Sequence, residues 1–227
     1  IWLNYPNNPT GASASLEFFE QIIHLAKKHD ILVCHDSAYS QVYFEGERPP
    51  SILQIPGAKD VAVEFQSLSK SHHMAGWRSG ALLGNRDVVR SLYQLKTNLD
   101  SGHFRPILDA STTALMGDQS FMRERNSILR QRRDALISGL ETAGLHPDHP
   151  KASLYVWCPA PDGWNSEQFT LSVLEETGVS MTPGTVFGSG GQDFVRISLT
   201  APLESIKLAV QRLGEWLPSA TSRRIVS

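Results

Sequence analysis

The chain has 227 residues, of which 41% are apolar and 19% charged, and its formal net charge is −2. This near-neutral balance argues against a dedicated nucleic-acid binder, which is usually basic. No run reaches the roughly 18 consecutive apolar residues that a membrane-spanning helix needs, so the composition favours an ordinary globular protein.

The first half of the chain alternates short apolar runs with helical patterns. After a strand at residues 1–3, apolar residues at helical spacing predict a helix over residues 16–29, with Ser15 as its N-cap. Continuous apolar runs, which are typical of parallel strands covered on both faces, predict further strands at 31–34, 61–65 and 80–83. This alternation predicts an α/β domain with a mainly parallel sheet.

The second half is richer in helical patterns. They dominate from residue 86 to about 143 and include a long helix over 121–143, which Gly144 would cap. Its arginines are expected to form a solvent-exposed face: Arg123, Arg125, Arg130, Arg132 and Arg133. A smaller α+β unit should follow, with strands at 154–158, 179–182 and 194–199 and helices at 166–177 and 203–217.

These patterns predict a domain organisation. We expect the C-terminal portion of a large domain at residues 1–122, a small C-terminal domain at 123–217 and a frayed polar tail at 218–227. The chain opens as a strand, with no initiator methionine and no targeting pattern, so we expect it to be a fragment or a processed product.

The two cysteines, Cys34 and Cys158, each lie in a predicted apolar strand. Neither has ligand-type neighbours at metal spacing, so we expect no metal site. The simplest interpretation is a pair of buried free thiols in a reducing cytoplasm, and a disulfide is the less expected alternative.

Asp36 closes the predicted strand at 31–34, and Tyr39 follows three positions later. Ligands of open α/β sheets gather at the carboxyl ends of strands, so a carboxylate there could meet a cofactor. An aspartate at a strand end is, however, often only a turn residue. The segment Asn7–Gly11, taken alone, likewise indicates only a tight turn.

Lys70 follows the predicted strand at 61–65 and has unusual company for a lysine in such a loop. The hydroxyls of Ser67 and Ser69 precede it closely, and Arg78 follows eight positions later. Serine and arginine bind phosphate through hydroxyl donors and a two-pronged guanidinium. A lone lysine would indicate only a surface residue, but this combination predicts an anionic cofactor attached through an amine.

Four motifs together resemble the class I/II aminotransferases, which are pyridoxal-phosphate (PLP) enzymes of fold type I. They have the family's order and roughly its spacing: Asn7-Asn8-Pro9-Thr10-Gly11, Asp36-Ser37-Ala38-Tyr39, Ser67-Leu68-Ser69-Lys70 with Gly76-Trp77-Arg78, and Val195-Arg196-Ile197-Ser198-Leu199. The resemblance runs from residue 1 to about 217. Segments 5–11, 96–102 and 150–157 are most similar to LL-diaminopimelate aminotransferases and their bacterial relatives.

The resemblance implies a role for each matching residue. Lys70 would hold pyridoxal 5′-phosphate as a Schiff base and then move the proton at the substrate α-carbon, and Asp36 would pair with the ring nitrogen. Asn8 and Tyr39 would hydrogen-bond the 3′-oxygen, and Tyr39 would count with Lys70 and Asp36 among the catalytic residues. The phosphate would be held by Ser67, Ser69 and Arg78. Arg196, with Asn8 beside it, would bind the substrate α-carboxylate as a bidentate pair.

Some positions depart from the family pattern. His72 and His73 follow Lys70 closely; they could tune the site near neutral pH or simply pack beneath the phosphate. Ala75 stands where a threonine is common, and Phe104-Arg105-Pro106 is also unlike the expected run. The family's N-terminal segment, which carries part of its phosphate site and substrate contacts, is not visible in this sequence.

The activity that the resemblance implies is transamination between an amino acid and a 2-oxo acid such as 2-oxoglutarate. LL-diaminopimelate is the candidate donor, which would place the protein in lysine biosynthesis. A PLP-dependent lyase or decarboxylase stays open because a fold does not fix a function, as does a non-catalytic aminotransferase-like PLP-binding domain. The resemblance further implies a cytoplasmic homodimer, with no nucleic-acid or membrane partner.

Overall fold

The computed structural model describes residues 1–46, 48–100 and 102–225, with side chains as far as residue 220. It divides into two compact units. The first contains residues 1–7 and 12–124, and the second contains residues 8–11 and the chain from residue 125 onwards. Ser101 of the segment 96–102, and residues 226–227 of the predicted tail, lie outside the described residues.

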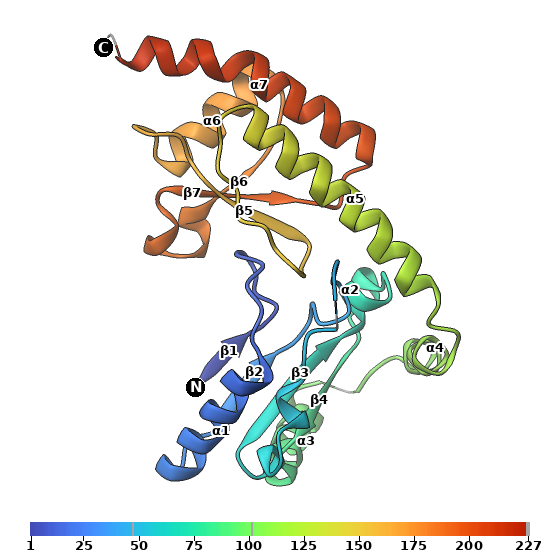
Figure 1. Ribbon diagram of the computed structural model, residues 1–227. Coiled ribbons are helices and arrows are strands. Elements are labelled where there is room, and N and C mark those ends of the chain that lie inside the picture. Colours follow the sequence, from blue (N-terminus) through green and yellow to red (C-terminus); the bar gives the residue numbers. More distant parts are fainter. Residues whose placement is uncertain (47, 101, 226–227) are drawn as a thin grey trace. The chain divides into compact units, whose positions relative to one another are not determined.

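The first unit is built on a four-stranded sheet in the order β1-β2-β3-β4 (Figure 1). The strands are β1 (Trp2–Asn4), β2 (Val33–Asp36), β3 (Ala62–Ser67) and β4 (Gly80–Gly84). β1, β2 and β3 are parallel, and β4 runs antiparallel to β3. The predicted α/β class with a mainly parallel sheet is therefore confirmed. The carboxyl ends of the three parallel strands and the start of β4 lie at one edge of the sheet.

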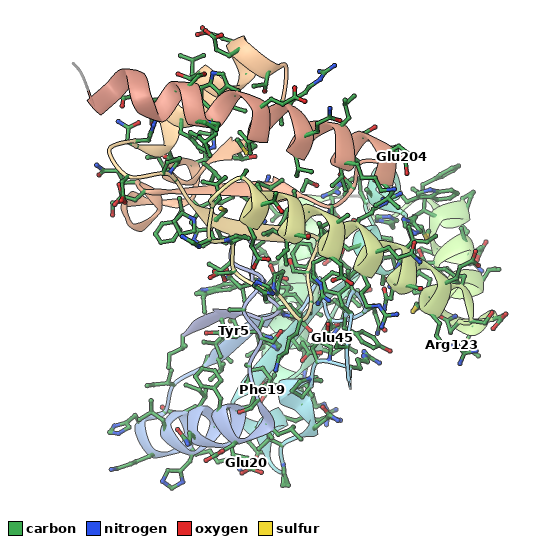
Figure 2. The ribbon with its side chains drawn as sticks, turned by 45° about the horizontal axis from the view of Figure 1, so that its top comes forward. Tyr5, Phe19, Glu20, Glu45, Arg123 and Glu204 are labelled. Atoms are coloured by element: carbon green, nitrogen blue, oxygen red, sulfur yellow. The ribbon has the colours of Figure 1, made fainter. Side chains whose placement is uncertain are left out.

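Helix α1 (Leu16–His29) has the bounds predicted from its apolar spacing. Ser15 fixes its start, because the serine Oγ accepts a hydrogen bond from Phe18 N at 3.1 Å. Phe19 lies on the sheet side of α1 (Figure 2) and is fully buried, in one core cluster with Ile23 and Val33. The unit's other helices are α2 (Leu68–Ser71), α3 (Arg86–Leu99) and α4 (Arg105–Met116).

The second unit has a three-stranded antiparallel sheet in the order β5-β7-β6. Its strands are β5 (Tyr155–Pro159), β6 (Thr182–Pro183) and β7 (Phe194–Ser198). Its helices are α5 (Phe121–Thr142), which begins in the first unit, α6 (Ser166–Thr177) and α7 (Leu203–Ile225). α6 has the predicted bounds because both ends are capped: Asn165 accepts from Gln168 N at 2.8 Å, and Gly178 adopts a left-handed φ of 71°.

Two predictions about the second half are wrong. The strand expected at 179–182 is reduced to Thr182–Pro183, because only these two residues pair with β7. The tail predicted to fray after residue 217 instead continues α7 through Pro218 as far as Ile225. Leu217 and Ala220 are both buried, so the apolar face of the helix extends beyond the proline and holds this segment.

The predicted exposed arginine face of α5 also needs correction, because Arg125 and Arg133 are buried. Arg125 donates from Nε and Nη2 to Asn126 Oδ1, at 3.1 and 3.0 Å. Arg133 donates to Pro150 O at 3.0 Å and to Asp134 Oδ1 at 2.7 Å. These acceptors offset the cost of burying the guanidinium groups, and helical spacing alone could not reveal them.

Cys34 and Cys158 are both buried and free, as the sequence predicted for these two thiols. Burial, helped by the charge of Asp148, raises the pKa of the Cys158 thiol to about 12. Burial also raises the pKa of Cys34. Among the described helices, none combines the length and hydropathy needed to span a bilayer.

Candidate functional site

Predicted cofactor residues lie at the carboxyl edge of the first unit's sheet, at or just after the ends of β2 and β3. Asp36 is the last residue of β2, as predicted, and pairs in register with Asn4 of β1 and Phe65 of β3. Lys70 lies on α2, which begins directly where β3 ends. Because the three strands are parallel, the segments that follow them leave the sheet at the same edge.

Arg78 reaches this edge from the opposite direction. Ser67, the last residue of β3, is in register with Gly80, the first residue of the antiparallel β4. A Cβ atom at Gly80 would lie 2.6 Å from Gln66 O, so glycine permits this close pairing. Arg78 precedes β4 with a left-handed φ of 54°, and its exposed side chain donates from Nη1 to Ala75 O at 3.1 Å.

Asp36 is held by its neighbours on both sides. Its Oδ1 accepts from Ala38 N at 3.1 Å, and its backbone oxygen accepts from Asn4 Nδ2 at 3.0 Å and from Tyr5 N at 3.2 Å. In the part of the chain that the structure describes, no hydrogen bond engages Oδ2, so this oxygen can accept one from a ligand. The contact from Asn4 was not anticipated; its only signal in the sequence was a polar residue at the end of a strand.

The remaining cofactor candidates of this unit follow β2 and β3 closely. Ser67 is the N-cap of α2, where its Oγ accepts from Ser69 N at 3.2 Å and can still donate its own hydrogen. Lys70 is half-buried, and Tyr39, in the turn after β2, is buried. An amine, hydroxyls and a guanidinium beside a carboxylate form a donor set that suits an anionic ring with a basic nitrogen.

His72 connects α2 to the segment before α5. Its Nδ1 lies 2.8 Å from Ser71 Oγ, its Nε2 lies 3.1 Å from Gln119 Oε1, and its ring packs on Phe121 with centroids 5.7 Å apart. His73 is exposed, with a left-handed φ of 56°. For His72, these contacts favour the packing role among the alternatives that the sequence left open.

The second unit brings Arg196 and Asn8 together. Arg196 lies on the central strand β7 and donates from Nη1 to Asn8 Oδ1 at 2.9 Å and from Nη2 to Thr182 Oγ1 at 3.3 Å. Its guanidinium carbon lies 4.1 Å from the ring centroid of Tyr155 and 4.7 Å from that of Phe187. Arg196 Nε is buried and has no hydrogen-bond partner among the described residues, which suits it to an incoming carboxylate oxygen.

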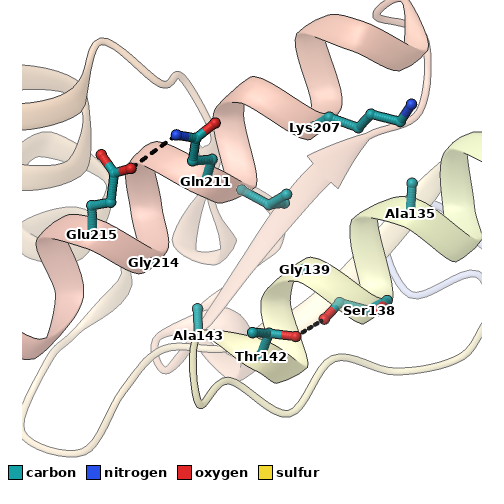
Figure 3. A pocket seen from close by; sticks show the side chains of 10 residues that line it. Ala135, Ser138, Gly139, Thr142, Ala143, Lys207, Gln211, Gly214 and Glu215 are labelled. Atoms are coloured by element: carbon teal, nitrogen blue, oxygen red, sulfur yellow. Dashed lines mark hydrogen bonds between the residues drawn. The ribbon is translucent and has the colours of Figure 1, made fainter.

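Two hollows in the described surface lie away from the predicted site residues. A groove of about 470 Å³ runs between α5 and α7 (Figure 3), where Gly139 lies so close to Val210 that a Cβ would meet its Cγ2 at 2.4 Å. A polar pocket of about 290 Å³ in the first unit is lined by Ser37, Ser40, Arg48, Pro49, Ser51, Gln54 and Gln66. None of the predicted site residues lines either of these two hollows, and it is the chemistry of their side chains that points to the site.

The sequence matches the family described as "Aminotransferase class I and II" over residues 1–213. The chain belongs to this family. Class I and II aminotransferases use pyridoxal 5′-phosphate and have fold type I, so the family, fold and cofactor predicted from the motifs are confirmed. The roles of individual residues remain predictions.

Curated relatives of this aminotransferase chain include two proteins named LL-diaminopimelate aminotransferase. The one from Syntrophobacter fumaroxidans is 47% identical over 213 residues, and the one from Gloeobacter violaceus is 48% identical over 214 residues. Each alignment covers 94% of this chain and 55% of the relative. The chain therefore spans about half the length of the curated relatives it matches.

Solved structures of aminotransferases have the same fold. A probable N-succinyldiaminopimelate aminotransferase from Thermus thermophilus has a TM-score of 0.90 at 38% identity, and the match covers 94% of this chain and 57% of that one. An aromatic aminotransferase from Pyrococcus horikoshii has a TM-score of 0.92 at 26% identity, covering 97% and 60%.

Proposed function

We propose that the full-length protein transfers an amino group from an amino acid to a 2-oxo acid such as 2-oxoglutarate, with PLP as its cofactor. One observation carries the proposal: Asp36 and Lys70 leave two neighbouring parallel strands at one sheet edge, and Arg78 precedes β4 at that same edge. An acid, an amine and a phosphate-binding cation are the groups that this chemistry needs.

The residues of the first unit suit the cofactor. Bound PLP supplies an aldehyde that reacts with amines and a ring that accepts electrons released at the substrate α-carbon. Lys70 Nζ would hold the cofactor through its aldehyde, and Asp36 Oδ2 would accept a hydrogen bond from the ring nitrogen. Phosphate binding would fall to the hydroxyls and guanidinium of Ser67, Ser69 and Arg78. Tyr39 would bind the 3′-oxygen together with Asn8, which belongs to the second unit.

Lys70 is also the proposed general base. Its amine would lie close to the substrate α-carbon and would take the proton there. The fixed negative charge of Asp36 would favour a protonated ring nitrogen, which makes that α-carbon proton easier to remove. Loss of either group should therefore slow the reaction, Lys70 as the base and Asp36 through its effect on the ring.

Arg196 is the proposed site for the substrate α-carboxylate. A guanidinium binds a carboxylate through two parallel N–H···O bonds, which fixes orientation as well as charge. The rings of Tyr155 and Phe187 restrict the guanidinium before substrate arrives, so less side-chain entropy is lost on binding. Asn8, already hydrogen-bonded to Arg196, would help to orient the substrate.

The names of the relatives support a more specific proposal. LL-diaminopimelate is the proposed amino donor, which would make lysine biosynthesis the pathway. By analogy with the family, the protein would be a cytoplasmic homodimer with no nucleic-acid or membrane partner. Residues 1–122 would form the C-terminal portion of the large cofactor domain, and residues 123–217 the small domain.

The alternatives have less support. A PLP-dependent lyase or decarboxylase would need contacts that promote release of the amino group or of the carboxylate, and among the described residues no contact favours either release. A non-catalytic PLP-binding domain would have little use for the oriented guanidinium of Arg196. Transamination uses every group that the two units present.

The test is a donor panel with the full-length, PLP-loaded protein. LL-diaminopimelate, alanine and aromatic amino acids are each supplied with 2-oxoglutarate, and glutamate formation is measured. Borohydride should trap the cofactor on Lys70, as shown by peptide mass spectrometry, and Lys70→Ala should lower the rate by at least about 10³-fold. Lys151→Ala is the control and should match wild type. Ammonia release without a 2-oxo acid would instead indicate a lyase.

A further inference from the structure

We propose that His35, held by Glu64, is a positioning residue that fixes Asp36 against the ring nitrogen of the cofactor. This proposal rests on the function proposed above, because it takes the role of Asp36 from there. Neither His35 nor Glu64 belongs to any of the four motifs, yet both are almost completely buried. His35 directly precedes Asp36 on β2, and Glu64 lies opposite His35 on β3, the strand that leads into α2 and Lys70.

His35 connects all three parallel strands. It precedes Asp36 on β2 and lies in register between Leu3 of β1 and Glu64 of β3. Its Nδ1 lies 3.1 Å from Glu64 Oε2, and its Nε2 lies 3.0 Å from the backbone oxygen of Tyr5, just after β1. The side chain is 0% exposed, so these contacts are not in competition with water.

Glu64 is surrounded by donors. Its Oε2 also accepts from Ser51 Oγ at 2.6 Å and from Ile52 N at 3.1 Å, and its Oε1 accepts from Gln66 Nε2 at 2.6 Å. Burial, the largest single effect, raises the pKa of Glu64, but the hydrogen bonds from His35, Ser51 and Gln66 and the charge of His35 together hold that pKa below its usual value. Glu64 is therefore a carboxylate.

The two partners of His35 determine what its ring must do. A carboxylate and a backbone carbonyl are both acceptors, so the ring is held between two acceptors, one at each ring nitrogen. A buried imidazole ring held in this way is directional and resists rotation. Phe19 of α1 adds to this restraint by packing on the imidazole, with ring centroids 4.9 Å apart.

This restraint acts directly on Asp36. Tyr5 accepts from His35 through its oxygen and donates through its N–H to Asp36 O at 3.2 Å, so a closed set of contacts joins the two neighbouring residues of β2. Successive side chains on a strand point to opposite faces. His35 therefore braces the backbone from one face while the Asp36 carboxylate points to the other.

The experiment uses the full-length, PLP-loaded protein and three substitutions. His35→Gln and His35→Asn each provide one amide donor in place of two ring donors, and Glu64→Gln removes the charge with little change of shape. Ile23→Ala, on α1 in the same core, is the matched control because it removes buried volume without touching the ion pair. The quantities measured are kcat, donor KM, bound cofactor and the pH midpoint of the cofactor's absorbance change.

A positioning role predicts that His35→Gln and Glu64→Gln lower kcat per bound cofactor by roughly 10- to 100-fold. The absorbance midpoint should shift while donor KM stays close to that of wild type. Ile23→Ala should lower the unfolding temperature but leave kcat per bound cofactor and the midpoint unchanged. A folded variant, as judged by circular dichroism, that can no longer hold the cofactor would also support the proposal.

Wild-type values of kcat and midpoint in both His35→Gln and Glu64→Gln would overturn the positioning role. The same holds if Ile23→Ala shifts the midpoint as much as they do, because general destabilisation would then explain the effect. If the wild-type protein itself forms no chromophore that borohydride can trap on Lys70, the proposed function fails first, and the two failures are thereby distinguished.

Discussion

The first unit buries an ion pair between two neighbouring strands of its sheet, whereas the second unit buries stacked aromatic rings. His35 and Glu64 have side chains 0% and 3% exposed and lie among directional hydrogen bonds. In the second unit Trp157 stacks on Phe194 with ring centroids 5.3 Å apart, and Phe169 packs within a cluster with Trp164 and Trp216. The ion pair of the first unit is held by charge and direction, and the aromatic cluster of the second by area and shape.

The difference corresponds to the work proposed for each unit. A carboxylate that must meet one ring nitrogen benefits from a brace that fixes its backbone closely. An arginine that must accept the carboxylates of two successive substrates benefits from flat aromatic walls, which restrict the guanidinium without using up its donors. The following substitutions test this contrast.

The largest expected effect is on Arg196 in the second unit. Arg196→Ala would remove two charged hydrogen bonds to the substrate carboxylate, each contributing about 1.5–3 kcal/mol, so kcat/KM should fall by roughly 10²- to 10⁴-fold. Cofactor content should not change. Arg132→Ala is the control, because among the described residues Arg132 donates to the backbone oxygens of Leu199 and Thr200 and to no side chain. A smaller loss than in the control would exclude Arg196 as the carboxylate site.

Phe169→Ala tests the aromatic interior. The ring is 0% exposed, and its removal should lower the free energy of unfolding by about 3–5 kcal/mol, measured by urea denaturation of the full-length protein. Leu171→Ala on the same helix removes a side chain that is 56% exposed and should cost much less. Equal costs would mean that α6 does not bury the face that the structure shows.

Glu64→Gln tests the charged interior, and its cost should be about 3 kcal/mol at neutral pH because it leaves a buried charge unpaired. The pKa of Glu64 is lowered on folding from an ordinary 4.5, so its carboxylate stabilises the fold above that pH. The contribution is lost as pH falls through the lowered value. When the free energy of unfolding is measured by urea denaturation at a series of pH values, its fall towards acid pH should be smaller in the variant than in wild type. An equal fall would contradict the ion pair.

The smallest effect is expected at the surface of the second unit. Lys207 Nζ lies 2.8 Å from Glu204 Oε1, and the two side chains are 54% and 80% exposed. A double-mutant cycle with Lys207→Gln and Glu204→Gln should give a coupling free energy below about 0.5 kcal/mol, which salt should weaken further. A coupling energy above about 1 kcal/mol would show that charge also matters to this unit.

Local signals in the sequence predicted the fold well wherever both ends of an element were marked. α1 and α6 were found with their observed bounds because Ser15 and Asn165 cap them. The strand at 179–182 failed because pairing with β7, and not its own composition, decides where β6 begins. The continuation of α7 past Pro218 depends on burial against the rest of the unit, which helical periodicity does not report.

For the candidate site, the sequence indicated which residues carry chemistry and at which strand ends they lie. Asp36 does end β2, and Lys70 does follow β3. The sequence did not reveal the pairing of His35 with Glu64, which are 29 positions apart and meet through the register of β2 and β3. The available signal was an ionisable residue directly after the apolar run at 31–34 and another within the apolar run at 61–65.

The two buried thiols have a practical consequence for experiments on this protein. With the pKa of Cys158 raised to about 12, only roughly one molecule in 10⁵ carries the reactive thiolate there at neutral pH, and Cys34 is shielded in the same way. A cysteine introduced on the surface of either unit should therefore take up a maleimide dye selectively. A fluorophore pair could then be attached without first removing either native residue.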